Sequence, residues 1–325
     1  MPKPTNRREF IKKSLAASAG IAAALSLEEK ALLAATGARK TTPPARTSAD
    51  MPQATIGDVK ISRIICGGNL IGGYAHSRDL IYVSDLLKSY FTDEKIFETL
   101  ELCEEQGINT IIAGTGHVPL FKRYWSERGG RIQWIAQCVP SANDLTTDLK
   151  KAVDGGAVGA QLIGNVGDEW SRAGQVDLID KVVEFIKDNG LIAGVGGHEI
   201  GTPMACEKAG LNPDFYMKTL HSTQYWSKRR PGQNKDVIDN YSVDNYWDKD
   251  PEKTVAFMKQ AEKPWIAYKV LAAGAIHPSQ GFEFAFRNGA DLLCVGMFDF
   301  QVVEDAIIAR QILAGDLARD RPWRA

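Results

Sequence analysis

The sequence of 325 residues lacks paired cysteines, an excess of charge of one sign and an apolar run long enough to cross a membrane. Its five cysteines form no CxxC pair, which excludes a disulfide framework and a zinc ribbon. Its 39 Lys and Arg nearly balance 40 Asp and Glu, so nothing in the charge recruits nucleic acid or an anionic membrane surface. With 44% hydrophobic and 24% charged residues, the composition is typical of a globular protein and not of a disordered, collagenous or coiled-coil one.

The first residues differ in kind from the rest. Arg7 and Arg8 precede Phe-Ile-Lys at 10–12, and an Ala-rich run that is too short to span a bilayer follows at 14–25. This order resembles a twin-arginine signal peptide, with Asn6 at a position where that signal usually has Ser or Thr. The alternative is a basic amphipathic helix at the start of the mature fold.

The signal-peptide interpretation divides the chain into three parts. We expect residues 1–38 to be recognised by the twin-arginine export machinery and cleaved after Ala38. Residues 39–53, rich in Pro, Thr, Ala and Ser, are expected to be a flexible linker, and 54–325 the catalytic domain. This order predicts a periplasmic or extracytoplasmic protein with no stable membrane span in its mature form.

Short apolar runs alternate with amphipathic helical runs from residue 54 onward. The runs are apolar nearly throughout, as expected of parallel strands covered on both faces. Eight strands are predicted, at 61–67, 109–113, 132–138, 157–165, 191–197, 214–220, 265–272 and 291–296. Eight βα units over about 260 residues predict a (β/α)8 TIM barrel of the α/β class. A doubly wound sheet is the alternative, but the turn at 67–73 lacks the G-x-G-x-x-G spacing that a dinucleotide-binding sheet needs.

Four segments resemble the aldo/keto reductases. They are the first strand and its turn at 61–69, the approach to the second strand at 106–110, the seventh strand at 266–274 and the eighth at 295–297. The resemblance covers most of the barrel and implies the same fold, with NADPH as the cofactor of a reductase.

The catalytic tetrad of that family is not retained in this sequence. The resemblance places its Asp at Ile112 and its Tyr near His117, while the third strand ends at 136–138 and the fourth at 164–165, without the family's Lys and His. The segment 297–300 carries a carboxylate where the family has basic residues for the ribose phosphate. An NADP-dependent reductase with rebuilt proton donors, among them His117, is therefore the alternative function.

All five histidines fall at or just after predicted strand ends, where barrel enzymes place their chemistry. They are His76, His117, His198, His221 and His277. His198 and Glu199 close the fifth strand and His221 the sixth, so these three side chains are predicted to hold a divalent ion, Zn²⁺ or Mn²⁺, completed by His117 or Asp168. The alternative is a set of ordinary loop or core histidines, with Glu199 in a salt bridge.

Two lysines, Lys218 and Lys269, lie within predicted strands. A strand lysine in a barrel either reacts as an amine or an acid with a lowered pKa, or pairs with a carboxylate for structure. Schiff-base aldolases of this fold use such a lysine, so lyase chemistry remains open.

Long connections at 68–92 and 222–250 are expected to cover the site. They mix aromatic residues with Asn, Asp and Arg, which suits a hydroxyl-rich ring. The predicted substrate-binding residues are Asn69, His76, Arg78, Asn165, Tyr225 and Trp226. The alternative is that these aromatic residues pin a lid or form a subunit contact.

Together these observations predict an exported enzyme that moves protons on a small carbohydrate or keto-sugar, as an isomerase, epimerase or lyase. A bound ion or Lys269 would polarise a carbonyl, while His198, Glu199 or His221 would transfer the proton. A non-catalytic sugar-binding module is the second alternative.

Overall fold

The computed structural model describes residues 51–74, 82–226, 228, 248 and 250–325. The chain divides into two units, Met1–Thr47 and Ser48–Ala325, and only the second contains described residues. The predicted signal peptide, most of the predicted linker, His76 and Arg78 lie outside the described residues.

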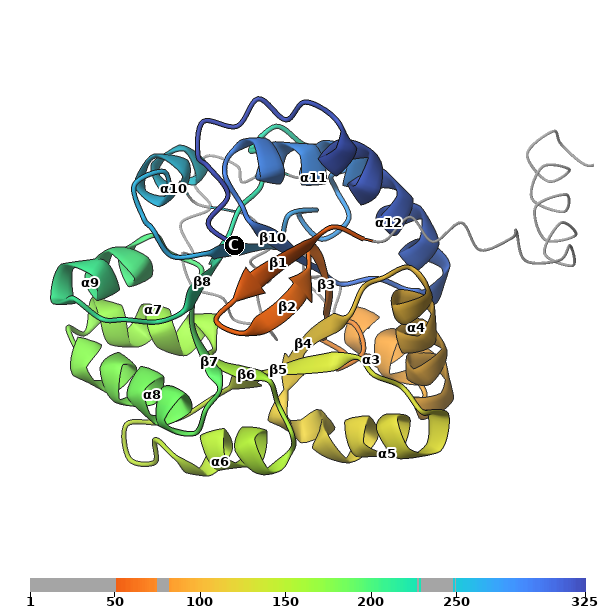
Figure 1. Ribbon diagram of the computed structural model, residues 1–325, viewed down its shortest axis with the longest axis horizontal. Helices are drawn as coiled ribbons and strands as arrows, with labels where there is room; N and C mark the ends of the chain where they lie inside the picture. The colour runs from red at the N-terminus through yellow and green to blue at the C-terminus, as the bar shows by residue number, and fades with distance from the viewer. Residues whose placement is uncertain (1–50, 75–81, 227, 229–247, 249) are drawn as a thin grey trace, which may run out of the picture. The chain divides into compact units, whose positions relative to one another are not determined.

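Eight parallel strands close into a barrel (Figure 1). In barrel order they are β10 (Leu292–Val295), β3 (Ile64–Gly67), β4 (Thr110–Gly114), β5 (Gln133–Cys138), β6 (Gly159–Leu162), β7 (Ile192–Gly197), β8 (Phe215–Thr219) and β9 (Trp265–Tyr268). Apart from β10 beside β3, each strand pairs with its neighbours in the sequence, as βα units require. The predicted (β/α)8 fold is confirmed.

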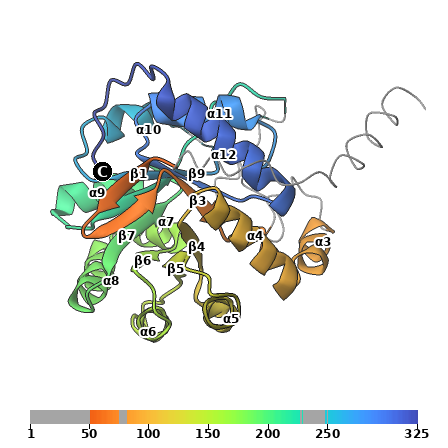
Figure 2. The same ribbon diagram turned by 45° about the vertical axis from the view of Figure 1, so that its right-hand side comes forward.

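Helices surround the barrel, and an apolar layer separates them from the strands. They are α3 (Val83–Tyr90), α4 (Asp93–Glu105), α5 (Val118–Arg128), α6 (Thr147–Asp154), α7 (Gly164–Arg172), α8 (Val176–Asp188), α9 (Gly201–Ala209), α10 (Pro251–Met258), α11 (Pro278–Arg287) and α12 (Asp299–Ala314), with the 3-10 turn η2 (Thr115–His117). Figure 2 shows α3, α4 and α12 on one side of the barrel. All five cysteines are buried and free, so they are core residues. No described helix has both the length and the apolar character needed to cross a bilayer.

A hairpin that the sequence analysis did not predict closes the amino-terminal end of the barrel. Strands β1 (Gln53–Ile56) and β2 (Val59–Ser62) pair antiparallel (Figure 1). Ile56 and Ile61 pack against the first residues of the strands, among them Ile192 and Leu292, in the apolar cluster of the barrel interior. Water is therefore excluded from this end, and the carboxyl ends of the strands are left for ligands.

The carboxyl-terminal segment is fastened beneath the barrel by buried charge. The Arg321 guanidinium donates to Asp291 Oδ2 at 2.6 Å and to four backbone carbonyl oxygens. Asp291 also accepts from the backbone N–H groups of Trp265 and Arg324, at 2.9 Å each. Because both charges are buried, each depends on its partners for compensation.

We expect Asp291→Ala to lower the free energy of unfolding by about 3–5 kcal/mol, because it leaves the buried Arg321 uncompensated. Asp320→Ala is the matched control, since Asp320 is 82% exposed and pairs with Lys259 on the surface. Its cost should stay below about 1 kcal/mol. Urea unfolding of both variants measures the difference, and equal losses would contradict this account of the carboxyl-terminal segment.

A second buried carboxylate, Asp305 of α12, has no hydrogen bond to Oδ2 from any described residue. Burial and the neighbouring charge of Glu304 raise its pKa to about 7. Between pH 4 and 7 the folded protein therefore holds a proton that the unfolded chain releases, and stability falls as the pH rises through this window.

Asp305→Asn should remove this dependence. We expect the variant to gain on the order of a few kcal/mol over wild type at pH 8 and almost nothing at pH 4, because only the ionised carboxylate is destabilising. Thermal or urea unfolding across this pH range measures the gain. A stability difference that does not change with pH would contradict the assignment.

Candidate functional site

The Asp168 carboxylate joins α7 to the carboxyl end of β7. It is almost fully buried and accepts hydrogen bonds from four groups. These are the backbone N–H of His198, the backbone N–H of Glu199, the Thr202 hydroxyl at 2.7 Å and His198 Nδ1 at 2.9 Å. Burial alone would raise the pKa of Asp168. The hydrogen bonds and the charge interaction with His198, together with the hydrogen bond from the Thr202 hydroxyl, hold this pKa below its usual value. Asp168 is therefore ionised at neutral pH.

Two close backbone approaches make this junction possible. A Cβ on Gly167 would lie 2.2 Å from the Gly196 carbonyl oxygen, and one on Gly196 would lie 2.6 Å from the Leu162 oxygen. Only glycine at these positions lets α7 lie directly on β7. Gly167 and Gly196 thus allow the backbones of α7 and β7 to approach closely.

His198 is the residue that Asp168 orients. Strand β7 ends at Gly197, so His198 lies in the turn that leads to α9. With Nδ1–H donating to ionised Asp168, a neutral imidazole carries its proton acceptor at Nε2. The ring also packs on Tyr268, with centroids 5.4 Å apart. One side chain from sequence-distant α7 therefore fixes both the tautomer and the direction of this histidine.

Tyr268, at the end of β9, is a site residue that the sequence analysis missed. Its hydroxyl is buried and has no hydrogen-bond partner among the described residues. Burial, with the nearby Asp168, raises the pKa of Tyr268 well above its usual value. The available signal was its place as the last residue of a strand, but its contact with His198 across the barrel could not be read from spacing.

A cavity of about 140 Å³ lies beside His198, between the β7–α9 and β8–α10 connections. Lys218, Asp248 and Thr254 also line it. Asp248 Oδ2 and Thr254 Oγ1 are buried without a hydrogen bond to any described residue. Buried polar atoms of this kind are normally satisfied, so the cavity suits a small polar molecule.

Lys218 reaches this cavity from the outer face of β8. Phe215 and Met217 point into the barrel, whereas Lys218 shares the opposite face with Tyr216. Its Nζ donates to the backbone oxygen and hydroxyl of Thr219 at 2.9 and 2.7 Å and lies 3.5 Å from Asp248 Oδ1. Burial raises the pKa of Asp248 despite this neighbour. Lys218 therefore lies on the outer face of its strand and has a carboxylate partner, as one of the two predicted alternatives required.

His221 is buried and committed to the backbone. Its Nε2 accepts from the Asp248 N–H at 2.7 Å, so Nδ1 carries the proton and donates to the Lys269 carbonyl oxygen at 2.9 Å. Burial lowers the pKa of His221 to about 3. Because both ring nitrogens are used, His221 in this arrangement holds the β8 and β9 connections together and is not placed to bind a metal or move a proton.

The predicted metal set is not assembled. Glu199 points to Arg172, with Oε1 3.1 Å from Nη1, while His198 turns to Asp168 and His221 to the backbone. Within the described residues, no three His, Cys, Asp or Glu side chains are arranged to hold a metal ion. These residues therefore do not fit Zn²⁺ or Mn²⁺, and the salt bridge that the sequence left open for Glu199 is present.

The remaining predicted residues are spread over the carboxyl-terminal face. Lys269 follows the end of β9 in a turn with φ of 59° and is not within a strand. His117 ends η2 and packs on Phe121, and burial lowers its pKa. The others are Asn69, exposed after β3, Asn165, exposed in the first turn of α7, and Tyr225 and Trp226 after β8. Tyr225 contacts His221, and Trp226 is 78% exposed.

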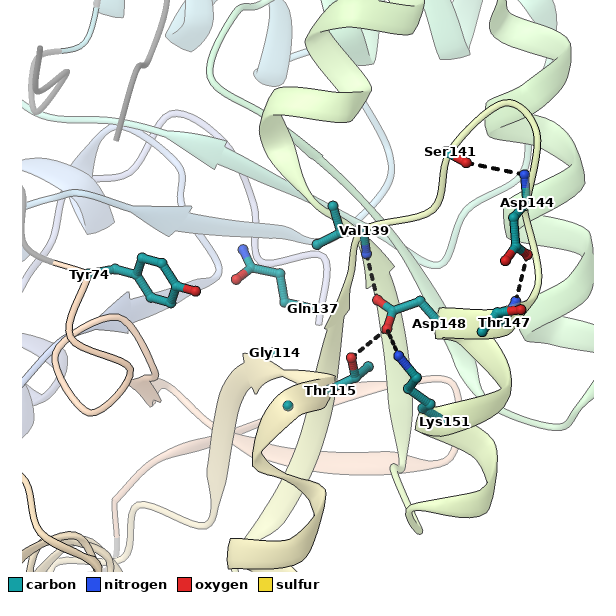
Figure 3. A pocket seen from close by; sticks show the side chains of 11 residues that line it. Tyr74, Gly114, Thr115, Gln137, Val139, Ser141, Asp144, Thr147, Asp148 and Lys151 are labelled. Carbon is teal, nitrogen blue, oxygen red and sulfur yellow. Dashed lines mark hydrogen bonds and ion pairs between the residues drawn. The ribbon is translucent and has the colours of Figure 1, made fainter. Parts of the chain in front are cut away.

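A larger cavity of about 390 Å³ lies at the carboxyl ends of β4 and β5. Figure 3 shows Gln137, Val139 and Tyr74 around it, with Asp148 joined to Thr115 and Lys151. Tyr74 lies in the first long connection and Gln137 at the end of the third predicted strand, but none of the residues that line this cavity was predicted to bind a ligand.

Comparison with known proteins supports the fold and goes no further. No protein-family model matches the sequence, and no curated protein is significantly similar to it. Two structures from Pseudomonas aeruginosa, provisionally assigned as aldo-keto reductases, share 14% identity with this chain. One has a TM-score of 0.52 and matches 83% of this chain and 97% of its own; the other has 0.55, with 82% and 98%. A truncated 3-deoxy-D-arabino-heptulosonate 7-phosphate synthase from Thermotoga maritima shares 13% identity, over 82% of this chain and 92% of its own, at a TM-score of 0.47. The chain thus has the fold of TIM-barrel enzymes and resembles aldo-keto reductases in architecture.

We expect the His221 ring to remain neutral, with the proton on Nδ1, from pH 5 to pH 8, because both nitrogens are bonded to backbone groups and the pKa lies near 3. Nitrogen-15 NMR of the imidazole, assigned with His221→Asn, reports the tautomer. Exposed His277, which N-caps α11, is the internal comparison. Titration of His221 near pH 6.5 would contradict the buried arrangement.

Proposed function

We propose that the protein catalyses proton transfer next to a carbonyl group of a small hydroxy-carbonyl compound such as a keto-sugar, by isomerisation, epimerisation or β-elimination. The observation that carries this proposal is His198, which Asp168 orients at the edge of a small polar cavity on the carboxyl-terminal face of the barrel. That face is where enzymes of this fold place their chemistry.

The roles follow from the contacts. Neutral His198 accepts the substrate's C–H proton at Nε2, and the resulting imidazolium is stabilised by the Asp168 carboxylate. The electron pair of the broken C–H bond moves onto the carbonyl oxygen and forms an enolate. Delivery of the same proton to the former carbonyl carbon, with the hydroxyl proton of the enediolate moving to the enolate oxygen, completes an isomerisation. Protonation of the original carbon by water from its opposite face gives an epimerisation, and His198 then passes its proton to the hydroxide that is left. In a β-elimination the enolate instead re-forms the carbonyl, a C=C bond forms, and the leaving group departs with its bonding electrons from the carbon on the far side of the deprotonated one. The His198 imidazolium then protonates that group.

Lys218 supplies positive charge on the other side of the cavity. Its Nζ is held by Thr219 and is buried, so its charge acts in a medium that screens it weakly. We assign it to the developing enolate oxygen. This replaces the role first expected of Lys269, whose backbone oxygen binds His221 instead.

The test is solvent deuterium exchange. A panel of ketoses, from dihydroxyacetone to D-fructose, is incubated with the full chain in D2O, and proton NMR follows loss of the signal next to the carbonyl. We expect exchange with wild type, a loss of about 10²-fold or more in His198→Gln, and a loss of similar order in Asp168→Asn, which leaves the imidazole without its orienting acceptor.

Glu199→Gln is the matched control. Glu199 is the next residue in the chain and borders the same cavity, but its carboxylate pairs with Arg172. We expect its exchange rate to remain within about threefold of wild type, since a surface ion pair contributes little. No exchange by wild type, or equal rates in all three variants, would refute the proposal.

A further inference from the structure

The larger cavity is a built site and not a gap between loops. Asp148 holds the lining of this cavity together (Figure 3). Its carboxylate accepts hydrogen bonds from the Thr115 hydroxyl at 2.5 Å and from the Val139 N–H at 2.8 Å, and Lys151 Nζ lies 3.4 Å away. These bonds tie the ends of β4 and β5 to α6. The lining is therefore held in place before any ligand arrives, which lowers the entropy cost of binding.

The charges of this cavity largely cancel. Lys151 lies beside Asp148, and the Asp144 carboxylate is used by the N–H groups of Thr146 and Thr147, which lower its pKa. One acidic charge is left over at the rim, which disfavours phosphates and other anions. A neutral ligand suits this surface.

The uncharged lining offers the groups that a hydroxyl-rich ring needs. Tyr74, 47% exposed, projects toward the Gln137 amide in Figure 3, and the Ser141 hydroxyl stands on the far side. Gly114 and Gly116 also line the cavity and leave open space beside the backbone. A Cβ on Gly116 would meet no atom within 4 Å, and one on Gly114 would meet none nearer than 3.9 Å. A cavity lined by an aromatic ring, an amide and a hydroxyl fits the C–H face and the hydroxyl rim of a sugar.

We propose that this cavity binds a neutral sugar ring that does not itself react. The ends of β5 and β7 are two inter-strand spacings apart, about 10 Å, with the start of α7 between them. A molecule of two linked rings spans that distance, so that one ring occupies this cavity while the other presents its carbonyl to His198. The preferred substrate is then a keto-glycoside, and a free ketose acts as a truncated substrate that fills only the cavity beside His198. This second step depends on the function proposed above, whereas ring binding does not.

Two glycines give a matched pair of blocking variants. Gly116 lines the larger cavity and Gly201 the smaller one, neither has a positive φ, and a Cβ on either meets no atom within 4 Å. Leucine at each position should fill its own cavity and leave the fold intact. Gln137→Met, which removes the amide at similar volume, gives an independent check.

Binding is measured by saturation-transfer NMR and calorimetry of the full chain with the methyl glycosides of D-glucose, D-galactose and D-mannose. We expect saturable binding of at least one, a loss of tenfold or more in Gly116→Leu and in Gln137→Met, and a change below twofold in Gly201→Leu. The proposal fails if none of the three glycosides binds, or if Gly201→Leu loses as much affinity as Gly116→Leu.

Deuterium exchange separates this proposal from the preceding one. Exchange of dihydroxyacetone should survive in Gly116→Leu and fall in Gly201→Leu, because the small ketose needs only the cavity beside His198. If exchange behaves in this way while no glycoside binds, the ring-binding cavity is wrong and the acid–base site stands. If glycosides bind but no ketose exchanges, the reverse holds.

Discussion

The carboxyl-terminal face of the barrel depends on the hydrogen bonds that the buried Asp168 carboxylate accepts. An ionised carboxylate in the protein interior is costly unless hydrogen bonds compensate it, and here four donor groups from the β7–α9 connection do so. The same bonds fix the turn, hold α7 on β7 and orient the His198 ring. Asp168 therefore serves both the fold and the proposed chemistry, because one of the groups that compensate its charge is the His198 imidazole that it orients.

The buried groups that stabilise the fold and the two candidate binding cavities lie at opposite ends of the barrel. The β1–β2 hairpin lies beneath the strands (Figure 1). Its aliphatic side chains fill that end of the barrel, and the buried Arg321 and Asp291 fasten the last residues of the chain. At the carboxyl ends, both cavities have polar linings, and some polar atoms of the smaller one are unsatisfied by the described residues. Such atoms destabilise a fold unless a ligand or water satisfies them, which is why they point to function.

The barrel could be predicted from the sequence, because each strand is a continuous apolar run and the helices show an apolar period with Gly or Pro near their ends. The sequence was not enough for the hairpin, whose two strands have four residues each and whose partners come from the ends of distant strands. The strand predicted at 265–272 ends at Tyr268, and the residues after it form a turn. Lys269, Ala272 and Ala273 have positive φ there, which no composition rule anticipates.

For the site, strand ends predicted where His198 would lie, and Asp168 was expected beside it only as a possible metal ligand, not as the acceptor for its ring. Asp168 is 30 residues away and sits in α7, a helix that begins directly at the end of β6. Lys218 could have been placed on the outer face by the alternation of Phe215 and Met217, whereas the commitment of both His221 nitrogens to backbone groups depends on tertiary contacts alone. Residue type and strand position predict a candidate, and only the partner decides its role.

The central claim is that Asp168 sets the tautomer and direction of His198. Nitrogen-15 NMR of the imidazole in wild type and in Asp168→Asn, below 20 °C and at pH 8, tests it directly. The account predicts a single neutral form in wild type, with the proton on Nδ1 and a strong hydrogen bond, and a mixed population of the two neutral tautomers in the variant. The same tautomer ratio in both proteins would contradict it, because the carboxylate would then not determine which nitrogen accepts a proton.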